Sequence, residues 1–299
     1  GLFKAGQCPP AQAAYVWSSP VARTQATSAA LVQGMFPGCN VPVNHAQKSQ
    51  DRLFHATENG LAPLDPAQTK AAILHAMGGS LDAARDRYAA PVLAMQQVVG
   101  VPTTCEQKNC ALSEQPWALK EKNGVVKLSS PLSVGAGMSE TFRMQYAEGL
   151  PLDQVAFGQG RSAEEVSRLM ALRSAKYALS NHIPYIARRG ASQLLGQILL
   201  ALQPTAAGSP PGTQWLAFVG HDTNIAQLRT LLGFDWKIAE YPENDFAPGG
   251  TLLFERWVDD HTGAQFVSVA YVARAWTNCA ACPTHRPIRC NTQVTRAKP

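Results

Sequence analysis

Two apolar segments, each followed at once by polar residues and a helical stretch, limit what this chain can fold into. The run WLAFV at 215–219 contains no polar position, which indicates a buried strand. The sequence GHDTN breaks that strand and begins a helix predicted to end at Gly233. The run AAYVW at 13–17 is likewise followed by a turn and by helix-favouring residues from about 21 to 35. With a short strand at 41–43, this alternation predicts an α/β fold.

The middle of the chain has a different character, because strands and helices no longer alternate there. Helical patterns predict helices over 66–77, 81–88, 139–148 and 163–179, with Asp65 and Ser80 as N-caps of the first two. Residues 99–128 are polar, lack apolar periodicity and are predicted to form a loop. The α/β pattern resumes with an amphipathic helix over 185–202. A hairpin of the strands 251–257 and 265–272 follows.

These patterns together predict the fold class and the domain organisation. We expect the α/β class, with a doubly wound sheet domain built from residues 1–45 and 180–275. A mostly helical inserted domain, residues 46–179, interrupts it. Residues 276–299 are predicted to form an atypical, unstructured basic tail.

The composition excludes two classes of protein and assigns the excess charge to one end of the chain. The 299 residues are 45% hydrophobic and only 16% charged, which excludes an intrinsically disordered protein. No apolar stretch approaches the roughly 20 residues needed to span a bilayer. The net charge is +5, but residues 261–299 carry five basic side chains and no acidic one, so residues 1–260 are charge-balanced. We therefore expect neither a nucleic-acid partner nor a membrane partner.

Side chains suited to chemistry follow both of the predicted strands. In an open α/β sheet, ligands bind beyond the carboxyl ends of the strands, where helix N-termini offer unpaired N–H groups. His221 and Asp222 follow one strand, and Arg23 lies within about one turn of the helix start after the other. An arginine and a histidine at a helix terminus suit a phosphate dianion, and the adjacent aspartic acid could protonate a departing alcohol.

These residues also have a purely structural interpretation. Asp222 or Thr223 then only caps the helix. His221 packs against the sheet, and Arg23 is solvated like most arginines at helix starts. The spacing alone leaves both interpretations open.

Several longer segments resemble one family in the same order along the chain. GHDTNIAQLRTLLGFDW, followed by APGGTLLFERW, is similar to the C-terminal signature of the histidine acid phosphatases, branch 2 of the histidine phosphatase superfamily. SSPVARTQAT, GMFPGCNVPVNH and LSVGAGMSETFRMQYAEGLPLDQVAFGQ extend the resemblance over most of residues 5–272. Within the family it is closest to the bacterial periplasmic glucose-1-phosphatases and then to the bacterial phytases. The resemblance implies that the helical insert covers the pocket and sets specificity.

The resemblance also implies a two-step hydrolysis of phosphomonoesters, with sugar phosphates or inositol phosphates as small-molecule substrates. A histidine in an Arg-His-Gly motif attacks phosphorus, and water then releases phosphate from the phosphohistidine. By match to the family motifs, Arg23 and His221 bind the phosphoryl oxygens and Asp222 is the general acid. No metal or other cofactor is expected. Glu148 falls where the glucose-1-phosphatase type has an acidic residue near its sugar, the alternative being an exposed glutamate at a helix end.

This chain departs from the family at the nucleophile. It contains no Arg-His-Gly, and none of its seven histidines follows an arginine. The resemblance begins after the family's first strand, so this strand and its nucleophile are expected to be missing. We therefore expect the chain to be inactive as written. A non-enzymatic binder of phosphate or sugar phosphate is the alternative.

The four cysteines of residues 1–260 and the three of residues 261–299 lead to different expectations. By the resemblance, Cys8 pairs with Cys39 and Cys105 pairs with Cys110, which suits a periplasmic protein although no secretory signal opens the chain. The tail contains the pattern C-x2-C-x2-H-x4-C, formed by Cys279, Cys282, His285 and Cys290. A zinc knuckle that binds nucleic acid is therefore an alternative for this segment.

Overall fold

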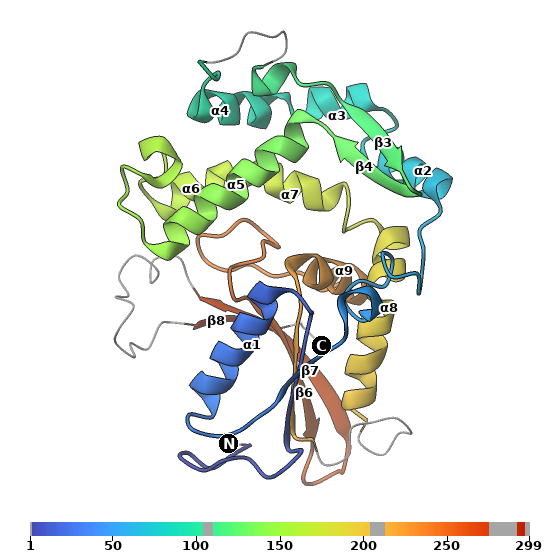
Figure 1. Cartoon of the computed structure of the whole chain (residues 1–299), viewed down its shortest axis with the longest axis vertical. Coiled ribbons are helices and arrows are strands. Elements are labelled where there is room, and N and C mark those ends of the chain that lie inside the picture. Colours follow the sequence, from blue (N-terminus) through green and yellow to red (C-terminus); the bar gives the residue numbers. More distant parts are fainter. Residues whose placement is uncertain (1, 104–109, 204–212, 275–291, 297–299) are drawn as a thin grey trace. The chain divides into compact units, whose positions relative to one another are not determined.

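A computed structural model of the chain describes residues 2–103, 110–203, 213–274 and 292–296 (Figure 1). The chain forms two compact units, each assembled from segments that are distant in the sequence. The first unit comprises Gly1–Leu64 and Ile186–Leu231, and the second comprises Asp65–Tyr185 and Leu232–Pro299. Both strand–helix segments of the predicted sheet domain thus lie in the first unit, whereas the predicted hairpin is grouped with the helical second unit.

A parallel three-stranded sheet forms the centre of the first unit. Its strands are β1 (Ala14–Ser18), β2 (Val43–His45) and β5 (Trp215–Val219), in the order β2-β1-β5. Val16 in the middle strand is fully buried, whereas all five residues of β5 are only partly buried. Among the described residues, β5 has a strand partner only on the side of β1. The apolar run at 215–219 therefore forms the predicted strand but is less buried than its sequence suggests.

Helices lie on both sides of this sheet (Figure 1). α1 (Ala22–Met35) connects β1 to β2, α8 (Pro184–Ala201) precedes β5, and α9 (Asp222–Leu232) follows it. Because β2 and β5 flank β1 on opposite sides, right-handed connections direct the chain to opposite faces of the sheet. This order creates a switch point between β1 and β5, the place where ligands of open α/β sheets bind.

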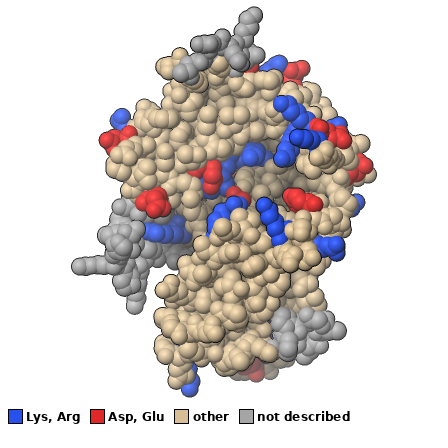
Figure 2. Space-filling view, in the orientation of Figure 1, with Lys and Arg blue, Asp and Glu red and all other residues tan. Residues whose placement is uncertain are grey.

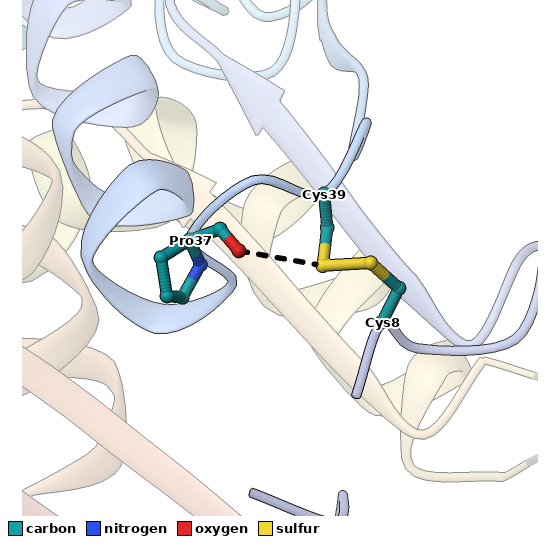
Figure 3. The surroundings of a disulfide bond; sticks show 3 residues. All are labelled: Cys8, Pro37 and Cys39. Carbon is teal, nitrogen blue, oxygen red and sulfur yellow. Dashed lines mark hydrogen bonds between the residues drawn. A yellow bond between two sulfur atoms is a disulfide. The ribbon is translucent and has the colours of Figure 1, made fainter. Parts of the chain in front are cut away.

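A disulfide bond joins the N-terminal segment to the chain that follows α1 (Figure 3). Cys8 and Cys39 are bonded, with their Cα atoms 5.5 Å apart, as the resemblance implied. Cys39 Sγ also lies 3.9 Å from the carbonyl oxygen of Pro37. Cys110 is disulfide-bonded as well, but Cys105 lies outside the described residues.

The second unit contains most of the helices. The α-helices of this unit are α2 (Pro66–Ala76), α3 (Leu81–Arg87), α4 (Ala89–Val99), α5 (Pro131–Glu148), α6 (Ala163–Leu169) and α7 (Ala171–Ala178). It also contains the 3-10 turns η2 (Leu112–Glu114) and η3 (Val155–Gly158). A third such turn, η1 (Lys48–Gln50), belongs to the first unit. The helices predicted here are present, although α6 and α7 divide a stretch expected to be continuous. Asp65 and Ser80 do cap α2 and α3, accepting from backbone N–H groups at 2.7 and 3.0 Å.

The prediction of a loop over 99–128 is wrong from residue 118 onward. β3 (Ala118–Lys122) and β4 (Val125–Ser129) form an antiparallel hairpin. Asn123 and Gly124 connect the strands with φ angles of +53° and +75°, the conformation for which Asn-Gly is preferred in two-residue hairpins. No residue of either strand is buried, so apolar periodicity could not reveal them. The Asn-Gly pair was the available signal.

A second three-stranded sheet lies in the second unit. Its strands are β6 (Thr251–Val258), β7 (Gln265–Arg274) and β8 (Thr292–Arg296), paired antiparallel in that order. β6 and β7 confirm the predicted hairpin. β8 lies within the segment for which the sequence predicts no structure, and it pairs with β7. The four zinc-knuckle residues fall in 275–291, outside the described residues.

Charged side chains are held together inside the second unit. Arg143, Arg173 and Asp245 are each 3% exposed. Asp245 Oδ1 lies 2.7 Å from Arg173 Nη1, and its Oδ2 lies 3.4 Å from Arg143 Nη1. The half-exposed carboxylate of Glu140 contacts both arginines. This cluster ties α5 and α7 to the segment before β6, because each buried charge faces an opposite charge.

Much of the surface carries no charge on the face drawn in Figure 2, in keeping with the 16% of charged residues. None of the helices in the described ranges is long and apolar enough to cross a membrane.

Candidate functional site

The candidate site lies within the first unit, at the carboxyl ends of β1 and β5. Ser19 follows β1 directly, and its backbone N–H donates to the carbonyl oxygen of Val219 at 2.9 Å. His221 follows β5 after one glycine. These two neighbouring parallel strands bring Ser19 Oγ to 3.0 Å from His221 Nε2. The pairing of β1 with β5 therefore assembles the site from segments about 200 residues apart.

Arg23 reaches the same imidazole from the first turn of α1. Its Nη2 lies 3.1 Å from His221 Nδ1. A guanidinium nitrogen can only donate, so Nδ1 must accept and the imidazole proton must be on Nε2. Nε2 therefore donates to the hydroxyl of Ser19. The side chain of Arg23 is exposed, as the structural interpretation expects, but it also contacts His221, as a shared phosphate site requires.

The electrostatic surroundings favour a neutral His221 in the ligand-free site. Burial lowers the pKa of His221 from its ordinary value of 6.5, and the positive charges of Arg23 and His55 lower it further. The carboxylates of Asp222 and Asp51 act in the opposite direction. A phosphate dianion placed beside Arg23 would offset this repulsion and favour protonation of His221. Arg23 and His221 could then both donate to its oxygens.

Asp222 is the first residue of α9, next to His221. Its Oδ1 accepts from the backbone N–H of Thr223 at 2.8 Å, an interaction that holds the carboxyl group at the helix start. A carboxyl group in this position is adjacent to the group that would hold a phosphate. It is therefore placed to act on an ester oxygen.

Asn224 fixes the backbone of this turn, a role that sequence reasoning missed. The residue is 4% exposed. Its Oδ1 accepts from the backbone N–H of His221 and its Nδ2 donates to the carbonyl oxygen of Phe54, both at 2.9 Å. Asn224 therefore links the turn after β5 to the 51–55 segment. Asn224 is the third residue of the helix and His221 precedes the first, so this spacing was the signal for a side chain that reaches back to the N-cap backbone.

The 51–55 segment adds a second histidine that sequence reasoning also missed. The ring centroid of His55 lies 5.2 Å from that of His221, and its Nε2 lies 3.5 Å from Ser19 Oγ. Asp51 is buried, and its Oδ2 lies 3.9 Å from His55 Nε2. The spacing of an aspartate four residues before a histidine was the only signal, and it is a weak one.

One further predicted site residue, Glu148, belongs to the second unit. Glu148 is the last residue of α5 in the second unit and is exposed, next to the left-handed Gly149 that ends the helix. Within the described part of the chain, no group of three or more histidine, cysteine or carboxylate side chains could hold a metal ion.

Fold and site together define an α/β protein with an arginine, a histidine and an aspartic acid at the switch point of its parallel sheet. The chain belongs to the histidine phosphatase superfamily, branch 2, which it matches over residues 1–272. The resemblance seen in the sequence motifs is thus confirmed.

Named relatives lie among the bacterial phytases and glucose-1-phosphatases. The chain is 30% identical to phytase AppA of Escherichia coli (strain K12) over 288 residues, which is 91% of this chain and 66% of that protein. It is 28% identical to the glucose-1-phosphatase of Salmonella typhimurium, covering 96% of this chain and 70% of that protein. The chain therefore spans only about two thirds of the length of these relatives.

Solved structures share the fold. The phytase of Klebsiella sp ASR1 matches with a TM-score of 0.86 at 32% identity, covering 100% of this chain and 73% of that one. The Hafnia alvei phytase in complex with tartrate matches with a TM-score of 0.87 at 30% identity, covering 99% and 74%. These likenesses confirm the predicted α/β class with helical insertion.

Proposed function

We propose that this chain carries the phosphate-binding and acid half of an acid phosphomonoesterase site. The observation that carries the proposal is the contact of Arg23 Nη2 with His221 Nδ1 at 3.1 Å, beside Asp222 at the start of α9. A guanidinium and an imidazole offer donors to adjacent phosphoryl oxygens, and the helix N-terminus adds a favourable dipole. Membership of the histidine phosphatase superfamily supports the same reaction class.

The acid step uses Asp222. In the proposed mechanism, His221 and Arg23 neutralise the phosphoryl charge while a histidine nucleophile attacks phosphorus. The bond from phosphorus to the ester oxygen breaks, and protonated Asp222 delivers its proton to the departing alcohol. Water then hydrolyses the phosphohistidine. Because Asp222 must be protonated, the reaction favours acidic pH.

The 299 residues contain no Arg-His-Gly, so we propose that this chain by itself does not hydrolyse phosphomonoesters. Non-enzymatic binding of phosphate or sugar phosphate is the second candidate function, favoured by the same absence. The test is hydrolysis of p-nitrophenyl phosphate at acidic pH by the purified chain. We expect a rate no higher than that of Asp222→Ala. A measurable rate that Asp222→Ala abolishes would refute the proposed lack of turnover.

We propose sugar phosphates or inositol phosphates as the ligands. The relatives named glucose-1-phosphatase and phytase support this class, and Glu148 is proposed to influence the choice. Glucose 1-phosphate and inositol hexakisphosphate can be compared as ligands in calorimetric titrations of the wild type and Glu148→Gln. We expect the affinity ratio of the two ligands to change. Glu164→Gln, an exposed carboxylate on α6, is the control, and an unchanged ratio in Glu148→Gln would exclude a selectivity role.

We propose a periplasmic location. The Cys8–Cys39 bond fits an oxidising compartment, as does the disulfide-bonded Cys110. Fractionation of cells that express the gene from its own locus would test this, and recovery of the protein in the cytoplasm with reduced thiols would contradict it.

A further inference from the structure

A line of four side chains leads from a buried carboxylate to the candidate phosphate site. Asp51 is 1% exposed, and its Oδ1 accepts from the backbone N–H groups of Leu53 and Phe54 at 3.2 Å each. Its Oδ2 is also buried, but it makes no hydrogen bond within the described part of the chain. The nearest charged partner is His55, whose Nε2 lies 3.9 Å away. A buried carboxylate oxygen of this kind is costly unless a neighbouring group supplies a proton or a positive charge.

The hydroxyl of Ser19 lies between two imidazoles. Ser19 is fully buried, and its Oγ lies 3.5 Å from His55 Nε2 and 3.0 Å from His221 Nε2. Since Arg23 occupies Nδ1 of His221, the proton on Nε2 of His221 is donated to Ser19. Nε2 of His55 then lies between the hydroxyl of Ser19, at 3.5 Å, and Oδ2 of Asp51, at 3.9 Å.

His55 can satisfy these neighbours in two ways. With a proton on Nε2, it faces Asp51 Oδ2 as a donor. Without that proton, it accepts from the hydroxyl of Ser19, which meanwhile accepts from His221. When His55 is doubly protonated in the first arrangement and protonated only on Nδ1 in the second, the two differ by one proton and by one unit of positive charge near His221. We propose that Asp51, His55 and Ser19 form a relay that controls the protonation of His221.

In this relay His55 and Asp51 are positioning residues that act on His221 with opposite signs. The groups facing His221 are Arg23 on α1, Ser19 at the end of β1, Asp222 on α9, and His55 with Asp51 on the 51–55 segment. Among them, the positive charge of His55 lowers the pKa of His221 and the carboxylate of Asp51 raises it. The consequence for phosphate binding rests on the function proposed above, whereas the relay itself can be tested in the free protein.

The test is the pH titration of His221 in the ligand-free chain, followed through its imidazole nitrogens by NMR. His55→Gln removes the imidazole whose ring centroid lies 5.2 Å from that of His221, and with it the repulsion that lowers the pKa of His221. We therefore expect the midpoint to rise by about 0.5 pH unit or more. Asp51→Asn keeps an acceptor for Leu53 and Phe54 but loses the charge, so we expect the midpoint to fall. A purely structural role would not give shifts of opposite sign.

Control variants distinguish an effect on the relay from a general loss of structure. His75→Gln changes an exposed histidine on α2 in the second unit, and we expect it to leave the midpoint unchanged. His55 has a side chain that is 30% exposed, so His55→Gln keeps the test open if Asp51→Asn fails to fold. Midpoints of the folded variants within about 0.2 pH unit of the wild type, or shifts in the same direction, would overturn the relay.

Titration with inorganic phosphate distinguishes failure of the relay from failure of the proposed function. We expect the pH at which phosphate affinity changes to move with the midpoint of His221 in each variant. Midpoint shifts without any phosphate binding by the wild type would overturn the proposed function and leave the relay standing. Phosphate binding that requires Arg23 but ignores both relay substitutions would overturn the relay alone.

Discussion

Gly220, between β5 and His221, is the position where a single added methyl group tests the packing of the site. A Cβ there would lie 2.5 Å from Cδ1 of Phe54 and 2.8 Å from Oδ1 of Asn224. Carbon atoms in contact normally lie about 3.5–4.0 Å apart, so the ring of Phe54 must move by about 1 Å. Phe54 is only 5% exposed and cannot turn into solvent.

The expected effect of Gly220→Ala is a loss of both stability and phosphate affinity. Overpacking of this kind costs about 1–3 kcal/mol. Alanine also restricts the unfolded chain more than glycine does, which offsets about 0.4–1 kcal/mol of that cost. We therefore expect a net loss of roughly 1–2 kcal/mol in the free energy of unfolding, measured by urea denaturation. Displacing Phe54 also strains the hydrogen bond that its carbonyl oxygen accepts from Asn224 Nδ2. Because Asn224 holds the backbone of His221, phosphate affinity should fall about 3- to 10-fold.

The same chemical change elsewhere in the unit should have the opposite sign. Gly196 lies in the middle of α8, and a Cβ there would have no atom within 4 Å. Gly196→Ala should stabilise the chain by up to about 1 kcal/mol, because alanine favours the helix. If Gly220→Ala proves as stable as the wild type and binds phosphate equally well, the packing described for the site is refuted.

Three further predictions concern the charge cluster, the disulfide and the site histidine. Asp245→Asn removes a buried charge and should lower the free energy of unfolding by about 3–5 kcal/mol. Asp86→Asn changes an exposed carboxylate and should alter it by less than about 0.5 kcal/mol, so equal urea midpoints would contradict this. The double variant Cys8→Ser/Cys39→Ser should lose roughly 3–4 kcal/mol, given a sequence separation of 31, and an unchanged midpoint would count against a stabilising bond. Because the pKa of His221 is lowered in the folded chain, its contribution to stability is present above pH 6.5 and lost as the pH falls. His221→Gln should therefore lose less stability than the wild type between pH 7.5 and pH 5, and parallel losses would contradict the sign.

The fold was largely predictable because its strands and helices carry strong local patterns. The runs at 13–17 and 215–219 are apolar throughout, and Asp65 and Ser80 are good N-caps before helical stretches. The β3–β4 hairpin escaped because its strands bury no residue, so hydrophobic periodicity carried no information. Turn chemistry at Asn123-Gly124 was the stronger signal there.

The site was predictable only in part, because it depends on which strands are neighbours. Arg23 and His221 each follow a buried strand, so their meeting needed only the rule that ligands bind at strand ends. Asp51 and His55 lie in a segment without periodicity. They reach the site through the hydrogen bond from Asn224 to Phe54, a long-range contact that no local pattern specifies.

The most direct test of the central claim is the binding of inorganic phosphate to Arg23→Gln at pH 5, measured by titration calorimetry against the wild type. A charge-assisted hydrogen bond contributes about 1.5–3 kcal/mol, so the account predicts an affinity about 10- to 100-fold weaker. Arg85→Gln, the same change at an exposed position on α3, should bind within about 2-fold of the wild type. Phosphate binding by Arg23→Gln as tight as that of the wild type would contradict the account.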